Sequence, residues 1–279
     1  MSWRLRIRHT TGYRYTGEVR SSYNEARVTP LSTDRQVAVE AAVAVTPPTR
    51  TYRYWDYWGT LVDAFDVHEP HTELSVVGTS VVETSPPDVP VETAGWDDLA
   101  SPENCDRFAE LLGPTTYVPA IEDGVEDAPH RDGLSPSQAV EAAAGWVHER
   151  LEYAKGATDV GTTALDALHI GSGVCQDFAH LTLAVLRRMG IPARYVSGYL
   201  HPRSSAEVGT TATGESHAWV EAWTGEWWGF DPTHGGPVGE RHVVVGRARD
   251  YADVSPLRGI YHGAPAEGLT VSVEITRLE

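Results

Sequence analysis

The chain is poor in cysteine, in long apolar runs and in positive charge. Two of its 279 residues are cysteines, Cys105 and Cys175, so it lacks a disulfide framework. No apolar run approaches the roughly 20 residues that span a bilayer. The opening MSWRLRIRHT alternates like a half-buried strand and does not resemble a secretory signal. We therefore expect a globular protein of the reducing cytoplasm, without membrane contact.

The charge of the chain is acidic and unevenly placed. The formal net charge is -17, which argues against the clustered basic face that nucleic-acid binding needs. Much of the excess lies in residues 85–135, where 12 acidic residues face 2 basic ones. We interpret this segment as an acidic, solvated connector, not as a docking surface.

The hydrophobic pattern predicts an N-terminal β-domain over residues 1–84. After the opening strand come three alternating or apolar segments separated by proline, glycine and threonine: QVAVEAAVAVTPP, TLVDAFDVHEP and HTELSVVGTSVVET. We expect an antiparallel β-sandwich. Residues 85–134 are predicted to be a proline-rich linker with one short helix in SPENCDRFAELLG, where Cys105 would be a small buried or half-buried residue.

Residues 135–279 are predicted to form a compact α+β domain. The segment SPSQAVEAAAGWVHERLEY is a capped helix, and GVCQDFAHLTLAVLRRMGIP is a second helix that ends at Gly190 and Pro192. Three strand-like segments follow: ARYVSGYL, HAWVEAW and WWGFDP.

Cys175 lies at or next to the start of the second helix. Free backbone N–H groups and the positive end of the helix dipole stabilise a thiolate at such a position. Gly171 and Gly173 would let the backbone approach a substrate closely, and an N–H near Cys175 would donate to an oxyanion. Cys175 is therefore a candidate nucleophile.

A nucleophilic thiol needs a base, and the base needs an orienting acceptor. If the hairpin in ESHAWVEAWTGEWWGFDP centres on Thr224, His217 and Asp231 stand opposite each other with Cβ atoms roughly 4.5–5.5 Å apart. A bulge would shift this register. His234 is a weaker alternative as base, because a turn after Pro232 fixes it less well than a sheet would. His180, five residues beyond the thiol on its helix, is expected to point elsewhere.

Four motifs occur in order along the chain: GVCQDFAHL, GIPARYVSGYL, SHAWVEAW and GFDPTHG. Together with HTTGYRYTGEVRSSYNEARVTPL and GRARDYADVSPLRGIYHG, they resemble the transglutaminase-like cysteine enzymes of papain-like fold, in the bacterial type with an N-terminal β-domain. The resemblance implies a Cys175, His217, Asp231 triad and suggests Tyr153 as an oxyanion donor. The chain departs from the family where His234 replaces a common asparagine and where Thr60 follows Gly59.

These features predict an amide hydrolase that forms a thioester on Cys175 from a peptide, protein or isopeptide substrate. Transfer of the acyl group to an amine, as in a transglutaminase, is an alternative, and a non-catalytic scaffold is another. Cys175, His217 and Asp231 are also potential zinc ligands, but no C-x-x-C or H-E-x-x-H spacing supports a metal. We expect no metal and no cofactor.

Overall fold

The computed structural model describes residues 2–86, 93–121, 125, 127–214 and 216–279. Part of the predicted linker, residues 87–92, 122–124 and 126, therefore lies outside the described residues. In the described part of the chain, no helix is both long enough and apolar enough to cross a membrane.

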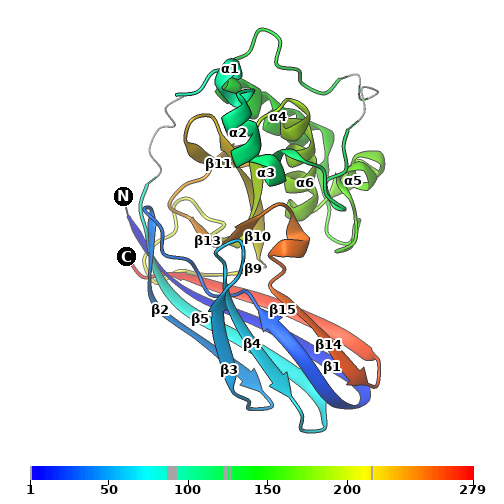
Figure 1. Ribbon diagram of the computed structural model, residues 1–279. Coiled ribbons are helices and arrows are strands. Elements are labelled where there is room, and N and C mark those ends of the chain that lie inside the picture. The colour runs from blue at the N-terminus through cyan, green and yellow to red at the C-terminus, as the bar shows by residue number, and fades with distance from the viewer. Residues whose placement is uncertain (1, 87–92, 122–124, 126, 215) are drawn as a thin grey trace.

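The larger of the two main sheets has eight antiparallel strands and curls over itself (Figure 1). Its strands are β1 Trp3–Ala26, β2 Gln36–Thr46, β3 Thr51–Trp55, β4 Leu61–Val67, β5 His71–Thr84, β9 Thr211–Gly214, β14 Leu257–Gly263 and β15 Ala266–Arg277. The expected antiparallel β-structure is present, but it is one curled sheet and not a sandwich of separate sheets. The reason is β1, whose first half pairs with β5 and β15 and whose second half pairs with β4 and β14.

Strands β14 and β15 belong to the curled sheet, although they fall within the predicted catalytic range 135–279. Both run antiparallel to β1, in a register that extends from Leu5 opposite Arg277 to Ala26 opposite Leu257. The α+β segment between them is therefore flanked in sequence by strands of the same sheet. Local hydrophobic pattern does not report such a distant pairing, because it contains no information about the partner strand.

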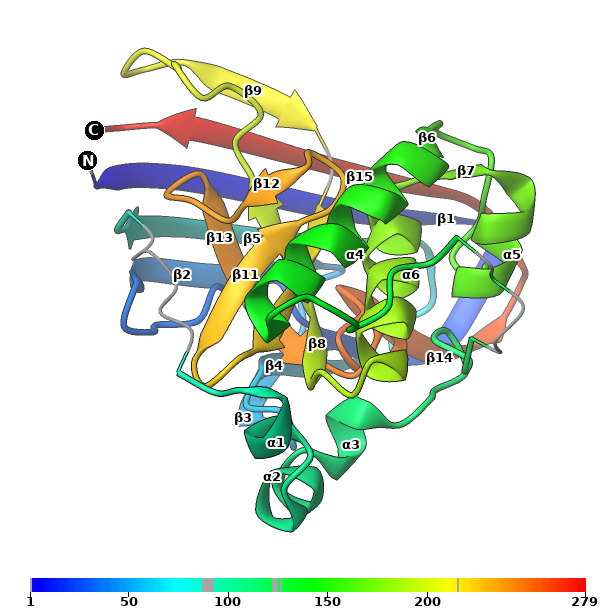
Figure 2. The same cartoon turned by 90° about the horizontal axis from the view of Figure 1, so that it is seen from above.

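The second unit packs helices against a five-stranded antiparallel sheet of order β12-β11-β10-β8-β13 (Figure 2). Its strands are β8 Ala193–Leu200, β10 His217–Trp223, β11 Trp227–Asp231, β12 Gly236–Pro237 and β13 His242–Ala248. Its helices are α1 Trp96–Leu99, α2 Pro102–Arg107, α3 Ala109–Leu112, α4 Pro136–Arg150, α5 Ala164–Ile170, α6 Cys175–Arg188 and the 3-10 turn Tyr251–Asp253. A parallel pair, β6 Glu152–Tyr153 and β7 Ser172–Gly173, completes this α+β unit.

The predicted helices of this unit form largely as expected. Ser135 caps α4 through a capping box with Gln138, and α6 is buried over nearly its whole length. The single helix predicted around Cys105 is instead two short helices, α2 and α3, interrupted at the buried Phe108. Cys105 is exposed, contrary to the expected burial.

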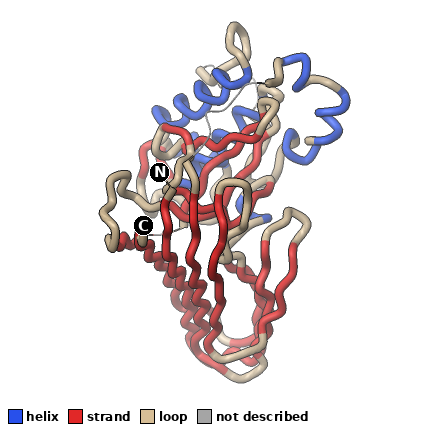
Figure 3. The backbone as a smooth tube through the Cα atoms, turned by 90° about the vertical axis from the view of Figure 1, so that its left-hand side faces the viewer, coloured by secondary structure: helices blue, strands red, loops and turns tan. Residues whose placement is uncertain are grey.

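The curled sheet and the second unit lie against each other (Figure 3), and they share a packed interface. Alternate residues at the start of β1 point toward the second unit and pack with Tyr199, Val243 and Val245; these residues are Trp3, Leu5 and Ile7. Val273 and Ile275 of β15 join the same cluster. Every member of this cluster is at most 4 % exposed, so the two units are held together by a continuous apolar core.

Gly198 of β8 stands opposite His217 of β10 and tests how tightly this sheet is packed. A Cβ at Gly198 would collide with the carbonyl oxygen of Val243 and come within 2.7 Å of the Trp219 ring. We expect Gly198→Ala to lower the free energy of unfolding by roughly 1–3 kcal/mol, because such overpacking displaces its neighbours. Chemical denaturation measures the change. Gly12→Ala is the matched control, since a Cβ there meets nothing within 4 Å; equal effects at both positions would contradict the prediction.

Candidate active site

Cys175 is the first residue of α6 and is half-buried. The turn before it is fixed by Asp177, whose Oδ2 accepts the backbone N–H of Val174 at 2.8 Å. A Cβ on Gly173 would lie 2.6 Å from that same Oδ2, so only glycine leaves room for this cap. Gly171 has a φ of 75°, which ends α5. Both glycines thus serve the turn that presents the sulfur.

His217 and Asp231 are brought together as the sequence predicts, but in a different register. Strand pairing places Val220 opposite Phe230 and Trp223 opposite Trp227, so the hairpin centres on Gly225 and not on Thr224. His217 and Asp231 are consequently diagonal neighbours on the same face of the sheet. Their side chains still meet, with His217 Nε2 at 2.7 Å from Asp231 Oδ2.

The carboxylate of Asp231 is buried and is the common acceptor of three histidines. His234 Nδ1 lies at 2.9 Å and His242 Nε2 at 3.1 Å from the same Oδ2 that His217 contacts. The backbone N–H groups of Thr233 and His234 donate to Oδ1 at 3.0 and 3.3 Å. Burial alone would raise the pKa of Asp231, but the hydrogen bonds outweigh burial and hold its pKa well below the ordinary value.

His242 was not anticipated from the sequence, and its role in the site is structural. Its Nδ1 accepts the N–H of Gly239 at 3.1 Å, so this nitrogen carries no proton and Nε2–H donates to Asp231. Burial is the main reason that the pKa of His242 is lowered. A neutral donor at this position orients the carboxylate without adding a charge. Nothing in the local pattern around residue 242 marks it, because it reaches Asp231 from another strand.

His217 is half-buried and is stabilised in its protonated form. Burial lowers its pKa, but the hydrogen bond with Asp231, the interaction with the Cys175 sulfur and the charges of both partners raise the pKa to about 10. Because Nε2 is held by Asp231, Nδ1 is the ring nitrogen left to exchange a proton with the thiol.

His180, which lies on α6, is separate from the histidines around Asp231. His180 is fully buried, and its Nε2 accepts the backbone N–H of Tyr251 at 3.2 Å. Burial lowers the pKa of His180 to about 3, so it stays neutral. This agrees with the expectation that it points away from the thiol.

A groove of about 570 Å³ opens over Cys175 and His217. Tyr153 lies on its wall, next to the turn before the thiol, because β6 pairs Tyr153 with Gly173. Its side chain packs against Phe178 and is 49 % exposed. The opposite wall comes from the curled sheet and carries Tyr13, Leu269, Thr270 and Val271. No local pattern in the sequence indicates that these strands reach the site.

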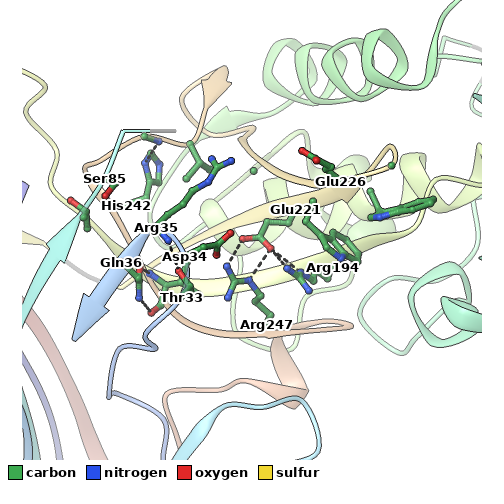
Figure 4. Close-up of a pocket in the computed structure, with 18 of the residues that line it drawn as sticks. Thr33, Asp34, Arg35, Gln36, Ser85, Arg194, Glu221, Glu226, His242 and Arg247 are labelled. Atoms are coloured by element: carbon green, nitrogen blue, oxygen red, sulfur yellow. Dashed lines mark hydrogen bonds and ion pairs between the residues drawn. The ribbon is translucent and has the colours of Figure 1, made fainter. Parts of the chain in front are cut away.

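A second pocket of about 700 Å³ lies along the same sheet, and His242 forms part of its wall (Figure 4). Its floor holds the carboxylate of Glu221, which pairs with Arg194 and Arg247. Burial would raise the pKa of Glu221, but the two arginines lower it. Glu221 lies on β10, the strand that begins at His217, so this ion-pair network belongs to the same sheet as the candidate site.

Three groups of the site are close enough to share a metal ion. The candidate ligand atoms of His217, Asp231 and His234 all lie within 4.8 Å of one another. The nitrogens of both histidines that face Asp231 already hydrogen-bond to its Oδ2. An ion bound there would have to replace those hydrogen bonds, so the arrangement fits a proton relay as it stands.

Comparison with known proteins defines the class. Residues 127–232 match the transglutaminase-like superfamily, and residues 5–83 match the bacterial transglutaminase-like N-terminal region. The chain belongs to this superfamily. An uncharacterized protein of Mycobacterium leprae is 52% identical over 99% of each chain.

Two further proteins extend the comparison. A protein-glutamine gamma-glutamyltransferase of Pseudomonas aeruginosa is 34% identical over 42% of this chain and 19% of its own length. A crystal structure from Cytophaga hutchinsonii, described as a "Putative Cysteine Protease", matches with a TM-score of 0.75 and 24% identity over 100% of this chain and 92% of that one. The structural match shows that the fold is shared.

The interaction between the sulfur and the ring predicts how His217 titrates. Because its pKa of about 10 lies above the ordinary 6.5, the contribution of the imidazolium to stability is complete below pH 6.5 and disappears as the pH rises toward 10. Cys175→Ala removes one of the causes, so we expect the pKa of His217 to fall. NMR titration of the ring measures it. Cys105→Ala should leave the value unchanged, and an equal pKa in both variants would show that Cys175 does not act on His217.

Proposed function

We propose that the protein is a thiol-dependent amide hydrolase acting through Cys175, His217 and Asp231. The observation that carries the proposal is the Asp231 carboxylate, which orients and charges an imidazole beside a cysteine at a helix start. The proposed substrate is an amide of a peptide, a protein or an isopeptide bond. Membership in a superfamily of cysteine-dependent enzymes supports the same reaction class.

In the first step the Cys175 thiolate attacks the carbonyl carbon of the amide. His217 Nδ1 gives its proton to the departing nitrogen, so the C–N bond breaks, ammonia or an amine leaves, and a thioester remains. In the second step His217 takes a proton from water, and the hydroxide attacks the thioester. The C–S bond then breaks, a carboxylic acid leaves and the thiolate returns.

Negative charge develops on the carbonyl oxygen in both steps. Backbone N–H groups in the first turn of α6 have no acceptor within the helix and are well placed to stabilise it. Tyr153 is proposed as a second donor because it lies on the groove wall beside the turn. Asp231 keeps the ring of His217 in the required tautomer, and His242 positions Asp231.

Acyl transfer to an amine is the second candidate reaction. The similarity to a protein-glutamine gamma-glutamyltransferase favours it. Both reactions use the same thioester, and they differ only in whether water or an amine reaches it. Cys175 is half-buried on the wall of an open groove, so we expect water to reach the thioester, which favours hydrolysis.

Turnover tests the proposal directly. With a pool of glutamine-containing peptides and an excess of a primary amine, we expect the native protein to release ammonia and to give mainly the hydrolysed acid, read by mass spectrometry. Cys175→Ala should abolish release, and Cys105→Ala should retain it, because Cys105 is exposed and far along the chain from the site. Amine incorporation as the dominant product would replace hydrolase with transferase. Turnover in Cys175→Ala would remove the nucleophile.

Activity also tests the role of His242. A hydrogen bond to a charged group contributes roughly 1.5–3 kcal/mol, so we expect His242→Leu to lower kcat about tenfold or more. His242→Gln keeps an N–H donor and should recover part of the loss. His234→Ala should have a smaller effect, since the His234 side chain is 50% exposed. If the leucine and glutamine variants are equally slow, His242 contributes only packing.

A further inference from the structure

Strand β15 has an edge without a partner strand beside the groove. On one side β15 pairs with β1 along almost its whole length. On the other side β9 covers only residues 273–276, so residues 266–272 have no partner strand there within the described ranges (Figure 2). The chain leaves this sheet at Gly214 and enters β10 at His217. The open edge therefore begins at the point where the segment that carries His217, the proposed base, leaves the curled sheet.

The backbone groups at this edge point outward. The N–H of Arg277 donates to the carbonyl of Thr210, toward β9, whereas the N–H of Leu278 points the other way, toward β1. Successive residues of a strand alternate in this respect, and the register with β1 is unbroken from Arg277 back to Gly268. Leu269 and Val271 therefore direct their N–H and C=O groups to the open edge. In the part of the chain that the structure describes, no hydrogen bond to them is found.

The same residues form the wall of the groove that contains Cys175 and His217. Val273 and Ile275 are buried on the face of β15 that contacts the second unit. Leu269 and Val271 continue that face, but they are 56% and 38% exposed. Leu269 and Val271 thus combine apolar side chains with unpaired backbone groups, in the part of β15 that the second unit does not cover.

This edge lacks the features that usually prevent strand addition. Proteins protect exposed edges with lysine, proline or a bulge. Residues 268–272, Gly-Leu-Thr-Val-Ser, contain neither lysine nor proline, and the bulge between β1 and β15 lies beyond them, between Ala266 and Gly268, where it ends the regular edge. Leucine, threonine and valine at such an edge favour pairing with another extended chain.

We propose that the open edge of β15, residues 268–272, binds the polypeptide substrate as an added β-strand and delivers it to Cys175. The proposal rests on the proposed function, because it assumes that the substrate is a polypeptide. Leu269 and Val271 exchange backbone hydrogen bonds with the substrate, and alternate substrate side chains pack against Leu269, Val271 and Tyr13. At about 3.4 Å per residue, this edge pairs with a segment of about five residues. The site thus selects extended segments over helical or compact ones.

A scan of backbone methylation tests the pairing without changing the protein. The probe is a synthetic peptide of about ten residues that alternates threonine and valine around a central glutamine, with one N-methyl group per analogue. Dissociation constants are measured with Cys175→Ala, which binds without turnover. We expect methylation at alternate positions to weaken binding roughly five- to tenfold, and methylation at intervening positions to weaken it less than about twofold. Equal sensitivity at all positions, or at none, overturns strand addition.

A variant tests the protein side of the same contact. Val271→Pro removes the N–H at the edge, and we expect the same roughly five- to tenfold weakening of peptide binding. Val271→Thr keeps the N–H and the branched shape and should bind as the parent does. Should Val271→Pro fail to fold, amide exchange in the Cys175→Ala protein replaces it. Exchange at Leu269 and Val271 should be fast in the free protein and slowed by the peptide.

The outcomes separate this proposal from the proposed function. If methylation at alternate positions weakens binding but the native protein does not turn the peptide over, the docking edge is supported and the hydrolase is refuted. If the peptide is turned over but binding does not depend on alternate methylation positions, the hydrolase is supported and the docking edge is overturned. If Leu269 and Val271 are already protected in a concentration-dependent dimer that the peptide does not dissociate, a second copy of the chain occupies the edge and the proposal is wrong.

Discussion

The carboxylate of Asp231 is the interaction on which the organisation of the site depends. It is buried and ionised, and it accepts hydrogen bonds from three histidines and two backbone N–H groups. A buried charge is tolerable only when it is compensated in this way. The surrounding elements supply that compensation: β10 brings His217, β13 brings His242, and the turn after β11 brings the backbone donors. Because these donors converge on one group, the sheet can hold the imidazole of His217 in a fixed orientation toward α6.

Local sequence signals were sufficient for the parts of the site that lie on single elements. Glycine before Cys175 and an apolar helix after it mark the helix start, and the helix is found there. The pairing of His217 with Asp231 was anticipated although the assumed register was off by two residues. The error has a simple cause: Gly225 has a φ of 106° and closes the turn one residue later than assumed. A shift of two residues keeps every side chain on its face, so the two groups still meet.

The contributions of distant segments could not be read from the sequence. His242 completes the hydrogen bonding of Asp231, but it is brought there by the order of strands in the sheet and not by spacing along the chain. The wall of the groove formed by β15 was missed for a related reason. Its pattern indicates an exposed strand, and the partner strand β1 lies at the other end of the sequence. Pattern predicts a strand and its buried face, whereas pairing depends on the whole fold.

The pairing of β1 with β15 also constrains how the protein assembles. Leu5 meets Arg277, so closing this ladder encloses the entire catalytic segment in one loop. The entropy of closing so long a loop must be overcome before the ladder gains its hydrogen bonds, which makes such contacts slow to form. If the segment between β1 and β15 folds first, its two ends are already close together. The loop that remains to be closed is then effectively much shorter. The α+β unit would then act as the template on which the two ends of the curled sheet pair.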